Sequence, residues 1–126
     1  MAVNIFQNMI GRVFTSIEGG TEGDANMTFH ASDGSIFEFY HNSDCCESVV
    51  IQDVIGDIKD LLNSPLLMAE YVDSDGYPAP QNADSYTWTF YRFGTANGYV
   101  TIRWLGESNG YYSESVDYGE TLALTV

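Results

Sequence analysis

The stretch SYTWTFYRFGTANGYVTIRWL, residues 85–105, decides the fold. It contains two runs rich in aromatic and β-branched residues, 85–95 and 99–105, on either side of Asn97-Gly98. Such residues favour strands, and Asn-Gly readily adopts the positive φ angles of a two-residue hairpin turn. The stretch therefore predicts a β-hairpin.

The same combination of turn pair and flanking runs occurs twice more. Asp33-Gly34 separates residues 27–31 from residues 35–40, and Asn109-Gly110 separates the strand that ends at 105 from residues 111–118. These signals predict a second hairpin, and a meander of three strands at the carboxyl end. Further strands are expected at residues 12–17, 49–51 and 66–72.

One principal helix is predicted from residue 53 to about residue 62. Asp53 would cap it, and Pro65 would follow its end, since proline cannot continue a helix. Its apolar stripe consists of Val54, Ile55, Ile58, Leu61 and Leu62. We therefore expect an α+β fold in a single domain, residues 1–126, with about five to seven mostly antiparallel strands and this helix packed on one face.

Acidic residues dominate the charge. The chain has 18 acidic and 4 basic residues, a formal net charge of −14. Such a field repels the phosphate backbone, so we expect no direct binding of nucleic acid. It would attract basic proteins, including the basic grooves of nucleic-acid enzymes. The alternative is that the charge only keeps a small protein soluble.

The cysteines and the apolar runs suggest a cellular compartment. Cys45 and Cys46 are adjacent, and neighbouring cysteines rarely bridge each other. The amino terminus carries no visible secretory signal, and the longest apolar run, residues 66–69, is far too short to span a membrane. We therefore expect two unbridged thiols, no membrane association and a cytoplasmic location.

Two of the 4 basic residues, Arg92 and Arg103, lie on the predicted hairpin. With Asn97-Gly98 as a two-residue loop they face each other, and with a four-residue loop they are diagonal neighbours on the same face. Like charges so close destabilise a sheet unless an anion or a carboxylate lies between them. The other members of this face are Tyr86, Trp88 and Phe90.

Aromatic rings can stack on a base, and guanidinium groups can bind phosphates in bidentate fashion. This face therefore predicts a site for a nucleotide-like anion. The alternative is that acidic side chains satisfy both arginines and that the rings belong to the core.

Other clusters carry weaker signals. Residues 41–46, HNSDCC, include metal-ligand types but lack the paired spacing of a zinc site. Asp53, Asp57 and Asp60 would share one face of the predicted helix, as magnesium ligands or, more simply, as a solvated face. There is no GxSxG elbow and no phosphate-binding loop. We expect no metal, no cofactor and no enzymatic activity.

Several stretches resemble a family of small proteins of tailed phages and prophages. They are residues 27–35, 37–41, 44–49, 85–91, 98–104 and 108–117. The resemblance runs from about residue 4 to residue 117. The same chain is similar to the phage Thoeris anti-defence sponges of the first type, small α+β proteins that oligomerise and sequester cyclic ADP-ribose-like or cyclic oligonucleotide signals. No ligand residue is carried over from them position by position.

The resemblance implies a phage-encoded counter-defence protein in the host cytoplasm that binds a nucleotide-derived immune signal without catalysis. The alternative is an acidic nucleic-acid mimic, similar to an anti-CRISPR protein, that occupies the basic groove of a host defence protein. Apolar residues on both faces of the carboxyl-terminal meander, which one short helix could not cover, further predict a homodimer or a larger homo-oligomer.

Overall fold

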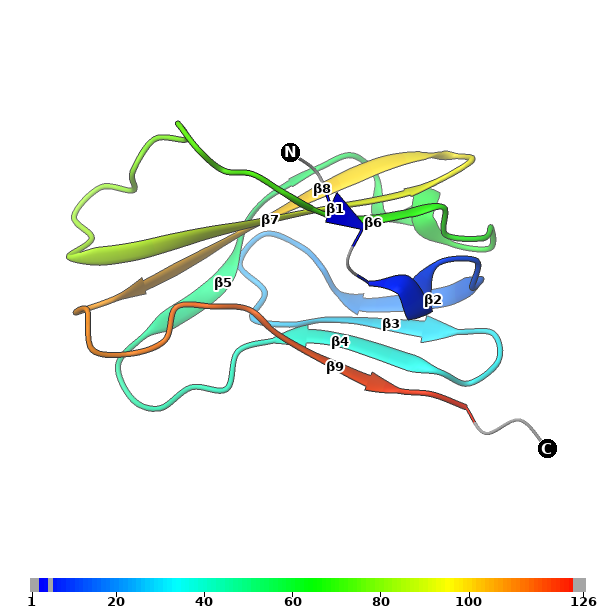
Figure 1. Ribbon diagram of the computed structural model, residues 1–126, viewed down its shortest axis with the longest axis horizontal. Coiled ribbons are helices and arrows are strands. Elements are labelled where there is room, and N and C mark those ends of the chain that lie inside the picture. The colour runs from blue at the N-terminus through cyan, green and yellow to red at the C-terminus, as the bar shows by residue number, and fades with distance from the viewer. Residues whose placement is uncertain (1–2, 5, 124–126) are drawn as a thin grey trace.

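The hairpin predicted from residues 85–105 forms the centre of one sheet of an antiparallel β-sandwich (Figure 1). The computed structural model describes residues 3–4 and 6–123, so residues 1, 2, 5 and 124–126 of the predicted domain lie outside it. The upper sheet of Figure 1 has the order β1 (Val3–Asn4), β6 (Met68–Val72), β7 (Ser85–Thr95), β8 (Gly98–Ser108) and β5 (Ser48–Ile55). The lower sheet has the order β2 (Phe14–Gly19), β3 (Met27–Ala31), β4 (Ile36–Tyr40) and β9 (Asp117–Thr121).

Two of the predicted hairpins are confirmed. In β7–β8, Thr95 pairs with Gly98, so the two loop residues are Ala96 and Asn97, one position earlier than the sequence predicted. In β3–β4, His30 pairs with Ile36 around the Asp33-Gly34 turn. Alternating strands and turn chemistry were sufficient here because both features are local.

The predicted helix at 53–62 is wrong, and with it the α+β class. Residues 53–55 complete β5, Gly56 turns the chain, and η2 (Ile58–Leu61) is a single short 3-10 helix. The β-branched Val54 and Ile55 favour the strand. Gly56 has a φ of 114°, and a Cβ there would lie 2.4 Å from the Tyr99 carbonyl oxygen. The described residues therefore form an all-β sandwich whose other helical element, η1 (Gln7–Met9), is also one 3-10 turn.

The predicted third strand of the carboxyl-terminal meander is also wrong. The chain turns at Gly110, crosses to the other sheet, and pairs there as β9 with β4. Glu114 holds the crossing segment in place, because its carboxylate accepts hydrogen bonds from the hydroxyls of Thr87 (2.8 Å) and Ser108 (2.5 Å). The segment passes so close to β8 that a Cβ at Gly106 would lie 2.1 Å from the Glu114 carbonyl oxygen.

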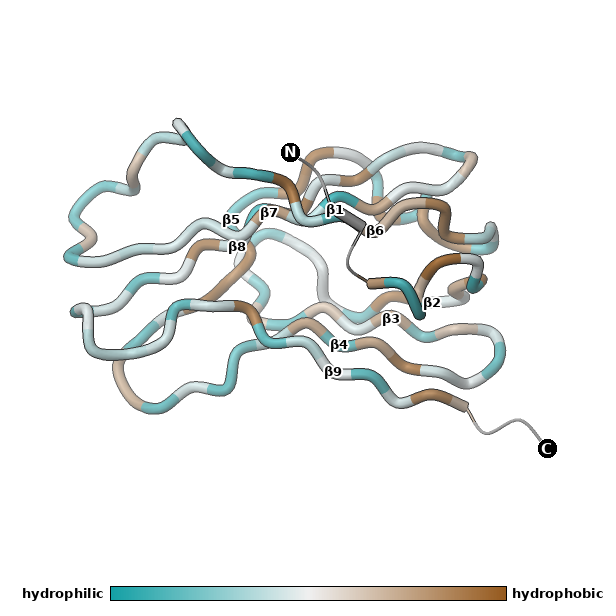
Figure 2. Tube along the Cα trace, in the orientation of Figure 1, coloured by the Kyte–Doolittle hydropathy of each residue, from teal (hydrophilic) through white to brown (hydrophobic). Residues whose placement is uncertain are grey.

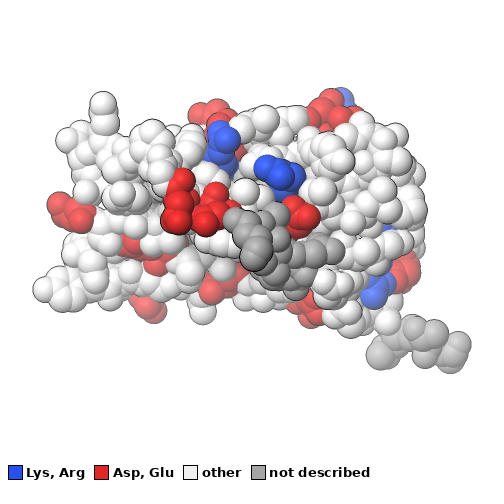
Figure 3. All heavy atoms as spheres, turned by 45° about the horizontal axis from the view of Figure 1, so that its top comes forward, with Lys and Arg blue, Asp and Glu red and all other residues white. Residues whose placement is uncertain are grey.

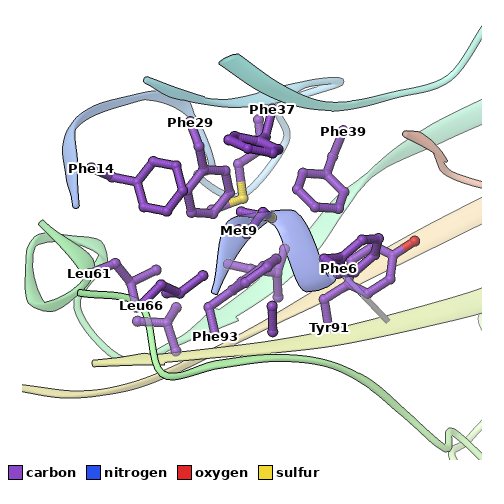
Figure 4. Close-up of a cluster of buried hydrophobic side chains, with 14 of the residues drawn as sticks. Phe6, Met9, Phe14, Phe29, Phe37, Phe39, Leu61, Leu66, Tyr91 and Phe93 are labelled. Atoms are coloured by element: carbon purple, nitrogen blue, oxygen red, sulfur yellow. The ribbon is translucent and has the colours of Figure 1, made fainter. Parts of the chain in front are cut away.

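The core lies between the sheets and is largely aromatic. Figure 2 shows the hydrophobic segments mainly along the strands, and Figure 4 shows rings from both sheets directed toward one another. Phe39 is fully buried, and its ring centroid lies 5.6 Å from that of Phe93 on β7 and 5.9 Å from that of Phe29 on β3. Such tilted and edge-to-face pairs stabilise the interface beyond the area they bury.

The connection from β4 to β5 contains the two cysteines. The structure joins Cys45 to Cys46 in a disulfide, so the prediction of two unbridged thiols is wrong. The cysteines therefore no longer argue for a reducing compartment. Separately, no helix among residues 3–4 and 6–123 is long and apolar enough to cross a membrane.

Candidate binding surface on the five-stranded sheet

Side chains of β7 alternate between the core and the outer face of the five-stranded sheet. Tyr91 and Phe93 point into the core. The alternate positions on the outer face carry Tyr86, Trp88, Phe90 and Arg92. Arg103 on β8 pairs in register with Phe90, and Arg92 pairs with Thr101. The two arginines are therefore diagonal neighbours on one face, as one of the two predicted registers requires. We call these five side chains the aromatic–arginine surface.

Arg103 already has an acidic partner. Its Nη1 lies 3.0 Å from Oδ2 of Asp53, the residue opposite it on β5. Its guanidinium carbon also lies 5.3 Å from the ring centroid of Phe90. The side chains of Arg103 and Asp53 are 24% and 45% exposed, so the pair is at the surface and solvent screens it. For Arg103, the Nη1 contact with Asp53 agrees with the alternative in which a carboxylate pairs with the arginine.

A sixth side chain, which the sequence did not predict, packs against this surface. Tyr77, from the loop between β6 and β7, lies edge-on to Trp88 and Phe90, with centroid distances of 4.9 and 5.0 Å. Its ring is 5.1 Å from the Arg103 guanidinium carbon, and the neighbouring Pro78 carbonyl accepts a hydrogen bond of 3.2 Å from the Trp88 indole nitrogen. Strand periodicity cannot place a residue in such a loop, and no local signal marks Tyr77 as a ring that folds back onto the sheet.

Arg92 differs from Arg103, because its side chain has no hydrogen bond or ion pair to any described residue. It lines a small cavity of about 280 Å³ together with Met68 and Tyr99. The absence of a side chain at Gly94 makes room for the Tyr99 ring, which would lie 2.7 Å from a Cβ at that position. Tyr99 is 64% exposed, so an aromatic face stands open to solvent beside a free guanidinium.

Charges of both signs surround the arginines. Figure 3 shows basic side chains close to acidic ones on the face that comes forward from the top of Figure 1. In register, Glu70 of β6 lies opposite Arg92, and Asp53 lies opposite Arg103. Phe90 is buried, Trp88 is half-buried and Tyr86 is 43% exposed. The aromatic–arginine surface therefore offers Tyr86 and part of Trp88 for stacking, and Arg92 as an uncommitted cation. The neighbouring Tyr99 adds a further exposed ring.

The residues of metal-ligand type at 41–46 form hydrogen bonds within the protein. His41 Nε2 lies 2.9 Å from the Glu47 carboxylate, and the two side chains are 4% and 0% exposed. The backbone amide of Asp44, then the His41 ring and the amide of Cys45, donate to this carboxylate and lower the pKa of Glu47 to about 2. No group of three or more His, Cys, Asp or Glu side chains in the described part of the chain is placed to hold a metal ion.

The three aspartates predicted to share a helix face are separated by the real fold. Asp53 lies on β5, Asp57 caps η2 through the amide of Lys59, and Asp60 lies within η2. The shared face therefore disappears with the helix, and so does the reason to consider these residues as joint ligands.

The fold and this surface together define an antiparallel β-sandwich whose candidate site is an open patch of aromatic and arginine side chains. The chain belongs to the DUF7448 family, described as a domain of unknown function, whose model matches residues 7–118. No curated protein and no solved structure matches the chain.

Proposed function

We propose that this protein binds a small nucleotide-derived anion on the aromatic–arginine surface and retains it without catalysis. The observation that carries the proposal is Arg92, a guanidinium without a partner among the described residues, in a chain with 18 carboxylates. It stands beside the exposed ring of Tyr99. A planar base on the ring and a phosphate on the guanidinium would satisfy both groups.

Arg103 would act as a second contact. A phosphate that reached it would have to replace Asp53, whose carboxylate now holds Nη1. Arg103 Nε is a buried donor with no partner among the described residues, so an incoming phosphate oxygen would also satisfy this group. Asp53 therefore competes with the ligand for Arg103, and an anion that binds weakly would not displace it.

The biological role rests on the resemblance to phage proteins. A phage protein that retains a nucleotide-derived immune signal would lower the free concentration of that signal in the host cytoplasm. The net charge of −14 opposes the approach of a polyanion, so the ligand should carry few charges. Cyclic ADP-ribose-like and cyclic oligonucleotide signals, in which ring closure removes terminal phosphate charge, are the class we propose.

A second candidate is the acidic mimic of nucleic acid. Five carboxylates of the described residues, in Glu18, Asp33, Glu47, Asp53 and Asp117, take part in ion pairs, counting those with histidine. The other 13 of the 18 acidic residues form no ion pair with a described residue, so their charge would attract a basic groove. In this case the arginines would contribute little.

Titration calorimetry with cyclic ADP-ribose isomers and with cyclic di- and trinucleotides tests the first candidate. Arg92→Gln should weaken binding about 10- to 150-fold, the value of a lost charge-assisted bidentate contact. Asp53→Asn should strengthen binding about threefold to fivefold, because it frees Arg103. Asp57→Asn is the matched control, since it removes an equal charge at η2 and should change nothing.

The two candidates predict opposite results. The mimic predicts no heat with any nucleotide, loss of inhibition on neutralising clustered acids, and no loss with Arg92→Gln. Heat with a nucleotide that is insensitive to both Arg92→Gln and Asp53→Asn would reject the aromatic–arginine surface as the site.

The homo-oligomer stays a prediction. The second sheet, not a helix, covers the inner face of β7 and β8, so only outer residues such as Tyr99 and Leu67, 64% and 61% exposed, are available for association. Light scattering at micromolar concentration tests it, and a particle of 14.0 kDa would reject it.

A further inference from the structure

A second cavity lies between β2, an edge strand of the four-stranded sheet, and β5, an edge strand of the five-stranded sheet. Its volume is about 610 Å³, within the range of small-molecule pockets. Its walls come from the end of β2 and the following loop on one side, and from the end of β5 and η2 on the other. Three of its wall positions, Gly19, Gly20 and Gly56, are glycines.

The floor of this cavity is apolar. Ile17, Val54, Ile58 and Leu62 line it, and each is half-buried and packed against the main core. These side chains therefore present their remaining exposed area to the cavity. A ligand that covered them would gain the hydrophobic free energy that the fold leaves unused here.

The wall of the cavity also carries a free cation. Lys59 lines it, and its ammonium group has no hydrogen bond or ion pair among the described residues. Two carboxylates also line the cavity, that of Glu22 on the β2 side and that of Asp57 on the η2 side with Lys59. Asp57 already accepts the Lys59 backbone amide at 3.0 Å. Together the two acids disfavour a ligand with several negative charges, while Lys59 favours a single one.

We infer that this cavity, which we call the β2–β5 pocket, binds a small monoanion with an aromatic or otherwise apolar body. The body lies on Ile17, Val54 and Leu62, and the anionic group, a carboxylate or a sulfonate, lies beside the Lys59 ammonium. The pocket shares no lining residue with the aromatic–arginine surface, so this inference goes beyond the proposed function and does not depend on it.

Anilinonaphthalene sulfonate is a suitable probe, because its fluorescence rises in an apolar site and it carries one sulfonate. We expect saturable binding at one site, with shifts of the methyl resonances of Ile17, Val54 and Leu62 in the NMR spectrum. Lys59→Gln should weaken this binding about threefold to fivefold, the size of an exposed ion pair. Phenylnaphthylamine, the same body without the sulfonate, should bind the wild type and Lys59→Gln equally.

Arg92→Gln is the matched control, since it removes the other cation that lacks a partner among the described residues. It should leave sulfonate binding unchanged. Equal effects of Lys59→Gln and Arg92→Gln, methyl shifts around Met68 instead of Ile17, or no saturable binding at millimolar probe would each overturn the inference. Nucleotide binding tests only the aromatic–arginine surface: Arg92→Gln should abolish it and Lys59→Gln should leave it intact. Each proposal can therefore fail without the other.

Discussion

The two sheets of the sandwich have similar inner faces and different outer faces. Toward the core, β4 presents Phe37 and Phe39 and β7 presents Tyr91 and Phe93. Outward, β4 presents Glu38 and the partly exposed Tyr40, whereas β7 presents its four residues of the aromatic–arginine surface. A solvated sheet needs only polar residues on its outer face. The fold does not require aromatic side chains on the outer face of the five-stranded sheet, so this face is the candidate functional surface.

The largest effect should come from the inner face that both sheets share. Phe39→Ala removes a fully buried ring that contacts rings from both sheets, and should lower the free energy of unfolding by about 3–5 kcal/mol. Urea denaturation measures this change. Tyr40→Ala, the next residue on the outer face and 37% exposed, is the control and should cost below about 1 kcal/mol. Equal losses would contradict the distinction between the two faces of β4.

Local signals were sufficient to predict two of the three hairpins and the shared face of Arg92 and Arg103. Both follow from period-2 alternation and turn pairs, which act within a few residues. The one-position shift of the β7–β8 loop did not matter, because either register left the arginines on one face.

Non-local contacts account for the failures. The stripe of Val54, Ile55 and Ile58 fits a helix by spacing, but pairing of β5 with β8 and the approach of Gly56 to Tyr99 favour a strand and a turn. The segment after Gly110 pairs with the edge of β4 that β3 leaves unpaired, and β4 lies far away in the sequence. The same limit applies to Tyr77 and to Asp53, whose contacts with Arg103 depend on the tertiary fold.

A smaller effect should follow from uncovering the aromatic–arginine surface. Tyr77→Ala removes two ring contacts, and should lower the free energy of unfolding by about 1 kcal/mol. It should also raise acrylamide quenching of Trp88 fluorescence, while Trp104, which is fully buried, stays protected. Tyr111→Ala is the control, because Tyr111 is 87% exposed. Unchanged quenching in Tyr77→Ala would mean that the loop does not cover this face.

The smallest effect concerns pH, and arises where the four-stranded sheet meets its loops. His41 follows β4, and its Nε2 contacts the Glu47 carboxylate at 2.9 Å while Nδ1 contacts the Ser115 carbonyl at 2.8 Å. Both oxygens accept hydrogen bonds, so this arrangement favours the imidazolium form of His41, in which both ring nitrogens donate. Burial lowers the pKa of His41, but these two hydrogen bonds and the charges of Glu47 and Asp117 outweigh it, and the net effect is a raised pKa.

The pKa shifts of His41 and Glu47 make the stability of the fold depend on pH. A raised pKa in the folded state means that the His41 contribution is complete below its usual value of 6.5 and is lost as the pH rises through the folded value. The lowered pKa of Glu47 means that its contribution is complete above its usual 4.5 and is lost as the pH falls toward about 2. The urea midpoint should therefore be highest between these two usual values and should decrease above them. His41→Gln should flatten the decrease on the alkaline side. His30→Gln is the control, because His30 meets Glu18 on the solvated outer face, with side chains 31% and 70% exposed, where an ion pair contributes little. A decrease that persists in His41→Gln and disappears in His30→Gln would place the titrating contact on the outer face and reverse the contrast between the two sites.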